Sequence, residues 1–96
     1  MVVHNPEQNR FEINQEGHTA ELVYRLKPGK IVLVHTGVPP ELEGRGLAKE
    51  LAVAGLAYAR EHGLKVVPLC PFVASYVKRH PEYLDLIDPP YLDRVQ

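Results

Sequence analysis

The segment Val38-Pro39-Pro40-Glu41-Leu42-Glu43-Gly44-Arg45-Gly46-Leu47-Ala48 separates two different sequence patterns. Before it, residues 31–36 form a β-branched and apolar run that is typical of a buried strand. After it, apolar residues recur at helical spacing up to Ala59, and His62-Gly63 supplies a helix stop. Tandem prolines exclude a regular helix or a strand ladder from the segment itself. The sequence therefore predicts a strand, a glycine-containing turn and a helix, in that order.

The residues upstream predict antiparallel strands. Residues 20–26 alternate as a strand does, and Lys27-Pro28-Gly29-Lys30 has the chemistry of a type II turn that joins them to the strand at 31–36. A first strand is expected near residues 11–13, which gives a three-stranded meander with the third strand most buried. Residues 2–10 are expected to be a loose entry.

The residues downstream predict one more strand and a second helix. Residues 64–69 are expected to form a short apolar strand. The helix from Gly46 to His62 precedes it, so strand, helix and strand are expected to form a β-helix-β crossover. Residues 71–79 predict a shorter helix with Pro71 in its first turn. After Tyr83, a polar tail with at most one helical turn is expected. The predicted architecture is a single α/β (α+β) domain: a mainly antiparallel sheet, one helix packed across it and a short second helix.

Composition narrows the class of function. The 96 residues allow one domain, and eleven Lys and Arg against twelve Asp and Glu give a net charge of −1, which does not favour binding to nucleic acid or to an anionic membrane. No signal peptide is visible at the start, and the single cysteine favours a reducing, cytoplasmic location. The five histidines show no pair at metal-ligand spacing on one element, so no metal site is expected. Oligomeric state is left open.

The glycines of the 38–48 segment favour an anion site. Strand, glycine turn and helix start together point backbone N–H groups and the positive end of the helix dipole at one place, where a pyrophosphate fits. An ordinary glycine-softened helix start is the alternative. The segment lacks the Gly-Lys-Ser/Thr ending of a Walker A loop and the third glycine of a dinucleotide fingerprint.

The same segment resembles the acetyl-coenzyme A binding motif of GNAT-fold N-acetyltransferases, whose frame of Arg or Gln, two residues, Gly, one residue, then Gly or Ala falls on Glu43, Gly46 and Ala48. Glu43 departs from that pattern. Residues 66–73 and 80–83, with their Cys-Pro-Phe-Val and His-Pro-Glu-Tyr strings, are similar to short stand-alone GNAT-like proteins, and the resemblance covers about residues 8–87 of one domain spanning 1–96. It implies that acetyl-CoA lies along the segment. The implied cofactor-binding residues are Val38, Glu43, Gly44, Arg45, Gly46, Leu47 and Ala48.

Three residues are candidates for catalysis. His35 lies at the end of a predicted strand, and a histidine, with an ordinary pKa of about 6.5, suits removing a proton from an ammonium group. Cys70 precedes a helix N-terminus, which favours a thiolate, so the family resemblance suggests an acetyl-cysteine relay or an orienting role. Lys78 stands where the larger superfamily often has a tyrosine that protonates the leaving thiolate. The alternative for His35 is an ordinary, partly buried strand histidine, for Cys70 a small buried apolar residue, and for Lys78 a solvated helix residue. Tyr76 and Tyr83 are further candidates for the proton donor.

The resemblance implies an acetyl-CoA-dependent N-acetyltransferase that moves an acetyl group to an amine of a small molecule or a protein. A non-catalytic module that binds coenzyme A or acyl-CoA is the alternative, because Glu43 and Lys78 both depart from the superfamily pattern. A purely structural interaction domain is a third reading. It predicts no affinity for coenzyme A at all.

Overall fold

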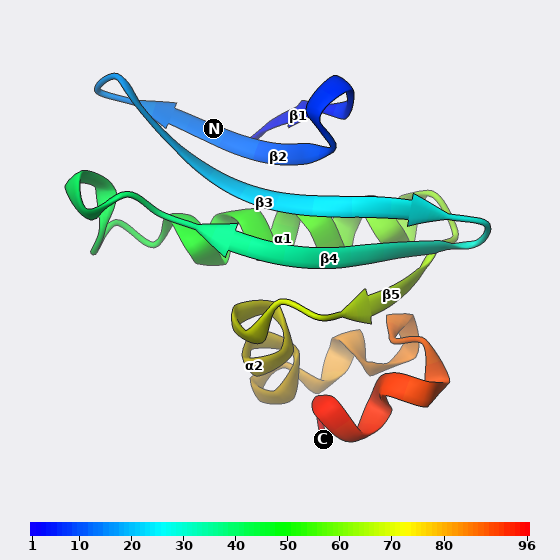
Figure 1. The fold of residues 1–96 in the computed structure, drawn as a ribbon. Helices are drawn as coiled ribbons and strands as arrows, with labels where there is room; N and C mark the ends of the chain where they lie inside the picture. Colours follow the sequence, from blue (N-terminus) through cyan, green and yellow to red (C-terminus); the bar gives the residue numbers. More distant parts are fainter.

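The computed structural model describes residues 1–96 and contains one five-stranded sheet in the order β1-β2-β3-β4-β5 (Figure 1). The first four strands are antiparallel to their neighbours, whereas β5 runs parallel to β4. This arrangement confirms the predicted fold class, including the crossover that carries the chain from β4 to β5. The strands are β1 (Val3–Asn5), β2 (Arg10–Gln15), β3 (His18–Lys27), β4 (Lys30–Gly37) and β5 (Lys65–Pro68).

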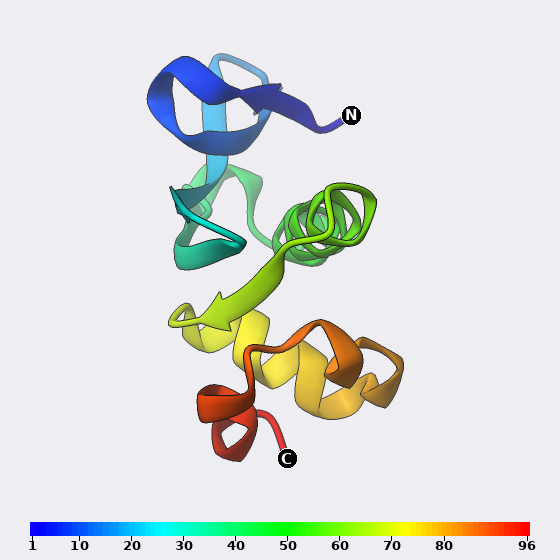
Figure 2. The same cartoon turned by 90° about the vertical axis from the view of Figure 1, so that its right-hand side faces the viewer.

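One long helix, α1 (Leu47–Glu61), crosses one face of the sheet, and a shorter helix, α2 (Pro71–Arg79), follows β5 (Figure 2). Both helices lie within one residue of their predicted bounds. At Gly55 α1 packs tightly on the sheet, since an added Cβ would lie 3.0 Å from Cδ2 of Leu22 on β3. Neither helix combines the length and the apolar character that a membrane crossing requires.

A β-bulge in β4 separates two differently paired halves of the strand. Tyr24 of β3 pairs with Leu33, but its neighbour Val23 pairs with His35, so Val34 is the extra residue. A bulge bends its strand and increases the local twist. The ladder from β4 to β5 ends at Leu33, whose carbonyl still accepts a hydrogen bond from the Cys70 N–H at 2.8 Å. Beyond this point no backbone hydrogen bond joins residues 34–37 to β5 or α2, and the two strands splay apart.

Both ends of the chain are more ordered than the sequence patterns predict. The expected loose entry contains β1 and a 3-10 turn, η1 (Pro6–Gln8), and the expected polar tail forms two 3-10 helices, η3 (Pro81–Leu86) and η4 (Pro89–Arg94). Ile87 is buried and continues the sheet through an isolated bridge to Val66 of β5. The tail is therefore part of the core, contrary to the prediction.

An aromatic cluster holds β1 against the rest of the fold. His4 stacks on Phe11 of β2 at 4.6 Å between ring centroids, and it meets Tyr58 of α1 edge-on at 4.9 Å. Its Nε2 lies 2.5 Å from the hydroxyl of Tyr24, which is 1% exposed. Burial, and secondarily the nearby His62, lowers the pKa of His4 below its ordinary value.

This lowered pKa predicts that the protein loses stability in mild acid. Because the folded state disfavours protonated His4, the contribution is complete above the ordinary pKa of about 6.5 and is lost as the pH falls through the lower folded value. Urea unfolding between about pH 7.5 and pH 5 should therefore show a falling free energy of unfolding. In His4→Phe, which keeps an aromatic ring without a titrating group, the decline should be shallower. Equal slopes in the two proteins would contradict this assignment.

Candidate functional site

A groove of about 250 Å³ opens between the end of β4, the N-terminus of α1 and the first turn of α2. It lies beside the splay between β4 and β5. We call it the glycine groove. Its lining residues are Val38, Leu42, Glu43, Gly44, Gly46, Leu47, Ala48, Lys49 and Phe72.

The N-terminus of α1 supplies the polar wall of the glycine groove. Gly46, the residue before the helix, has no side chain with which to cap it, so the first amide groups of α1 point outward without a side-chain acceptor. Gly44 and Gly46 both have a positive φ, 80° and 74°, which favours glycine at these two positions. Lys49 in the first turn adds a positive charge. Amides, helix dipole and ammonium group together suit a phosphate or pyrophosphate.

Six of the seven sequence-predicted binding residues line the glycine groove, and Arg45 does not. Glu43 lines the glycine groove and brings a carboxylate to it. Arg45 is not among the lining residues. Its guanidinium donates to Gln15 Oε1 at 3.1 Å and pairs with Glu16 in the β2–β3 hairpin. The structure therefore brings together Val38, Glu43, Gly44, Gly46, Leu47 and Ala48, and it directs Arg45 away from them.

Cys70 lies where β4 and β5 separate. It is 1% exposed, and its Sγ lies 3.0 Å from Oγ1 of Thr36. Thr36 pairs with Leu22, whose side chain reaches α1, so Thr36 and Cys70 lie on the α1 side of β4. This pair forms the floor of the splay.

His35 lies on the other face of β4. It is exposed and pairs with Val23, and consecutive strand residues point to opposite faces, so it does not meet Cys70. A Cβ added to Gly37 would lie 3.1 Å from His35 Nε2 and 3.7 Å from Glu21 Oε2. Both side chains therefore lean over the bare backbone of Gly37.

Figure 2 shows that α1 packs against one face of the sheet and leaves the other uncovered. A second hollow, of about 340 Å³, lies on the uncovered face beside Glu21 and Gly37. We call it the open-face hollow. Val38 lines both this hollow and the glycine groove, so the two meet at the end of β4. The lining residues are Thr19, Glu21, Gly37, Val38 and Pro39.

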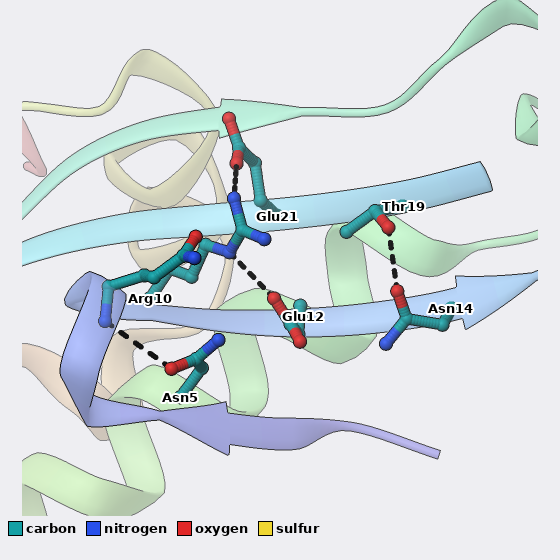
Figure 3. A network of polar contacts seen from close by, with 7 residues as sticks. Asn5, Arg10, Glu12, Asn14, Thr19 and Glu21 are labelled. Carbon is teal, nitrogen blue, oxygen red and sulfur yellow. Dashed lines mark hydrogen bonds and ion pairs between the residues drawn. The ribbon is translucent and has the colours of Figure 1, made fainter.

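Two carboxylates beside the open-face hollow share one guanidinium. Figure 3 shows Arg10 between Glu12 and Glu21: its Nε donates to Glu12 Oε2 at 2.6 Å, and its Nη1 donates to Glu21 Oε1 at 3.0 Å. The hydrogen bond from Arg10 lowers the pKa of Glu12, which keeps this carboxyl ionised. The three side chains carry a net charge of −1. Glu21 Oε2, the oxygen nearer Gly37, accepts no hydrogen bond from any side chain.

Lys78 and the two tyrosines lie apart from these sites. Lys78 is exposed in the last turn of α2, seven residues and about 10 Å of helix from Pro71 at the end that adjoins the glycine groove. Tyr76 stacks on His80 at 4.1 Å and lies 6.0 Å from Tyr83. Burial, with Tyr76 nearby, raises the pKa of Tyr83.

The sequence patterns missed four residues that the structure places at these sites. Lys49 follows the glycine motif within the first turn of α1, and a cation at this position is a usable signal for an anion site. Phe72 shows only the general apolar character of a packed aromatic residue. Thr36 and Glu21 carry no local signal, because their importance depends on strand register and on the bulge at Val34.

Comparisons with known proteins identify the family of this domain. A family model described as GCN5-related N-acetyl-transferase matches residues 10–86. Protein NATD1 of Mus musculus is 37% identical over 98 residues, which cover 99% of this chain and 84% of that protein. Protein NATD1 of Gallus gallus is 37% identical over 94 residues, which cover 93% and 86% of the two chains.

The fold is also similar to the solution NMR structure of a GCN5-like protein from Staphylococcus aureus. The TM-score is 0.72 at 32% sequence identity, and the match covers 92% of this chain and 87% of the other. These findings confirm the family resemblance that the glycine segment and the 66–83 region indicate. The chain belongs to the GCN5-related N-acetyltransferase family, and its domain is an acetyltransferase domain.

Proposed function

We propose that the protein is an acetyl-CoA-dependent N-acetyltransferase that moves the acetyl group to an amine. The observation that supports this best is the glycine groove, which opens at an uncapped helix N-terminus directly beside the splay of β4 and β5. A coenzyme with a pyrophosphate and a long thioester arm needs such a combination: a fixed anion site and a slot that leads from it.

The residues present fit this coenzyme. The amides of α1 and the ammonium group of Lys49 hold the pyrophosphate, and they outweigh the single carboxylate of Glu43. A side chain at Gly44 or Gly46 would be strained, because both have a positive φ. Val38, Leu42 and Phe72 provide apolar walls. Acetyl-CoA, when bound, supplies an acetyl group activated as a thioester.

Two groups of this chain act in the transfer. His35 Nε2 accepts a proton from the ammonium form of the acceptor at the open-face hollow, which leaves an amine with a free electron pair. The unpaired backbone edge of residues 34–37 in the splay holds the thioester arm as an added strand would be held. Thr36 and Cys70 close the floor of the splay. Lys78 and Arg45 take no part, since they lie away from both hollows.

Thermal unfolding with acetyl-CoA tests the binding part of this proposal. Ligand at about 100 times its dissociation constant should add roughly 2.7 kcal/mol of stability, which for a domain of this size raises the Tm by about 10–20 °C. Gly46→Glu should lose this shift, because the new carboxylate repels the pyrophosphate at the helix N-terminus.

Gly63→Glu is the matched control. Gly63 also has a positive φ, 64°, but lies beyond the other end of α1, so this variant carries the same backbone strain and charge change without touching the groove. It should lower the Tm and keep the ligand-induced shift. No shift in the unmodified protein at millimolar acetyl-CoA would refute the proposal and also the alternative of a coenzyme A binding module.

A further inference from the structure

We propose that the open-face hollow is the acceptor site and that it selects an aliphatic diamine, whose second ammonium group pairs with Glu21. The inference rests on the proposed function and names its substrate class. Three observations support the inference: the position of the hollow, the excess of negative charge beside it, and an oxygen of Glu21 that has no side-chain partner.

The open-face hollow lies where a second substrate could meet a coenzyme bound in the glycine groove. The glycine groove and the open-face hollow lie against the same end of β4 and share Val38. An acceptor in the hollow therefore approaches the splay from the face opposite α1, whereas the coenzyme reaches it from the helix N-terminus. The bare backbone of Gly37 keeps this passage open, since a Cβ there would crowd His35 Nε2 at 3.1 Å.

The charge of the hollow favours a cation. Arg10 is already paired with both Glu12 and Glu21, so the three groups retain one negative charge. The side chain of Glu21 is 30% exposed, and its Oε2 has no side-chain donor. On the same face of β3, Arg25 follows Glu21 by four residues, about 13 Å along the strand. An ammonium group satisfies Glu21, whereas a carboxylate near the amine would be repelled.

A single charge on the acceptor does not suffice. The reacting ammonium must give its proton to His35 before the nitrogen attacks, and with that proton it loses its attraction to Glu21. A second ammonium group stays charged throughout, so its ion pair with Glu21 persists in the transition state and contributes to rate. His35 Nε2 and Glu21 Oε2 lie no more than about 7 Å apart, because each lies within 4 Å of the same point over Gly37. A short aliphatic diamine such as 1,4-diaminobutane is within that limit.

The transfer balances with these groups. His35 takes one proton from the reacting ammonium. The nitrogen electron pair then forms the new bond to the acetyl carbon, and the bond from that carbon to sulfur breaks with its electrons going to sulfur. The second proton of the nitrogen passes to the thiolate. The products are the N-acetyl diamine, coenzyme A as its thiol, and one proton released from His35 to solvent.

The test is an NMR titration of the backbone amides with 1,4-diaminobutane and with 4-aminobutanoate, each in the presence of coenzyme A. We expect the diamine to shift the amides of Thr19, Glu21 and Gly37, and 4-aminobutanoate to bind at least roughly tenfold more weakly. Glu21→Gln should lose most of the diamine affinity, because it keeps the shape and removes the charge. Glu61→Gln removes a carboxylate at the exposed end of α1 and should change nothing.

Turnover is then measured with acetyl-CoA and the same two amines. Shifts at the hollow with acetylation of the diamine support both proposals. Shifts without acetylation support the cation site and refute the proposed transferase activity. Acetylation of amines without diamine shifts at the hollow, or with equal preference for 4-aminobutanoate, supports the transferase and overturns the acceptor assignment. An unchanged diamine affinity in Glu21→Gln overturns it as well.

Discussion

His35→Gln is expected to lower kcat for acetyl transfer by about 100-fold to 10,000-fold, the range that a general base contributes. Glutamine fills the same space and hydrogen-bonds, but it does not take a proton from an ammonium group. The side chain lies on the open face of β4, away from the glycine groove, so acetyl-CoA binding should be unaffected. The measurement is release of coenzyme A thiol at saturating acetyl-CoA and a fixed amine. The ligand-induced Tm shift serves as the check on binding.

Cys70→Ala is the informative companion to this variant. Cys70 is 1% exposed and hydrogen-bonded to Thr36, on the α1 side of the sheet. His35 lies on the other side, so it has no access to the thiol. We therefore expect direct transfer to the amine: Cys70→Ala should keep more than about a tenth of the wild-type kcat, and intact-mass spectra should show no acetyl adduct on the unmodified protein. An adduct on Cys70, or a loss in Cys70→Ala as large as that in His35→Gln, would establish a cysteine relay in place of direct transfer. A wild-type rate in His35→Gln would remove His35 as the base.

The centre of the fold was predictable because its signals are local. Lys27-Pro28-Gly29-Lys30 needs only its own backbone preferences to form a turn, and the glycines at 46 and 63 mark both limits of α1 whatever packs against it. The C-terminal segment has no such signals. Its 3-10 helices are too short to show a periodic pattern. Its buried residues are separated by prolines and acidic residues, among them Asp88, which is buried and accepts a hydrogen bond from Lys30 Nζ at 2.9 Å.

The candidate site also has a part that the sequence predicts and a part that it does not. The composition of the glycine segment predicts an anion site, and six of its seven predicted residues line one groove. The open-face hollow combines β3 with the end of β4, and the side on which His35 lies depends on one extra residue at Val34. A pattern read along one strand does not contain that register. Arg45 illustrates the opposite error: a phosphate contact is reasonable for an arginine in this segment until the β2–β3 hairpin brings Glu16 beside it.

Leu56→Ala is expected to destabilise the protein by about 2–5 kcal/mol, which lowers the Tm by about 10–30 °C. The helical pattern predicts an apolar face that omits Leu56, although Leu56 is fully buried. Its members are Leu47, Ala48, Leu51, Ala52, Ala54, Gly55, Tyr58 and Ala59, of which Ala48, Ala54 and Tyr58 are only half-buried. The reason is that α1 contacts α2 and η3 as well as the sheet, so its buried stripe is displaced toward the C-terminal segment. Alanine is the strongest helix former, so the loss reports packing alone.

Val53→Ala is the matched control for this substitution, because it makes the same helix-favouring replacement on the same helix at a residue that is 36% exposed. Its effect should stay within about 1 kcal/mol. Thermal or urea unfolding of both variants measures the difference directly. Similar losses in the two variants would mean that the C-terminal segment does not cover α1 in solution, and the tail would then be the solvated segment that its composition suggests. A large loss in Leu56→Ala alone, with an unchanged acetyl-CoA-induced shift, establishes that the tail completes the core without taking part in the glycine groove.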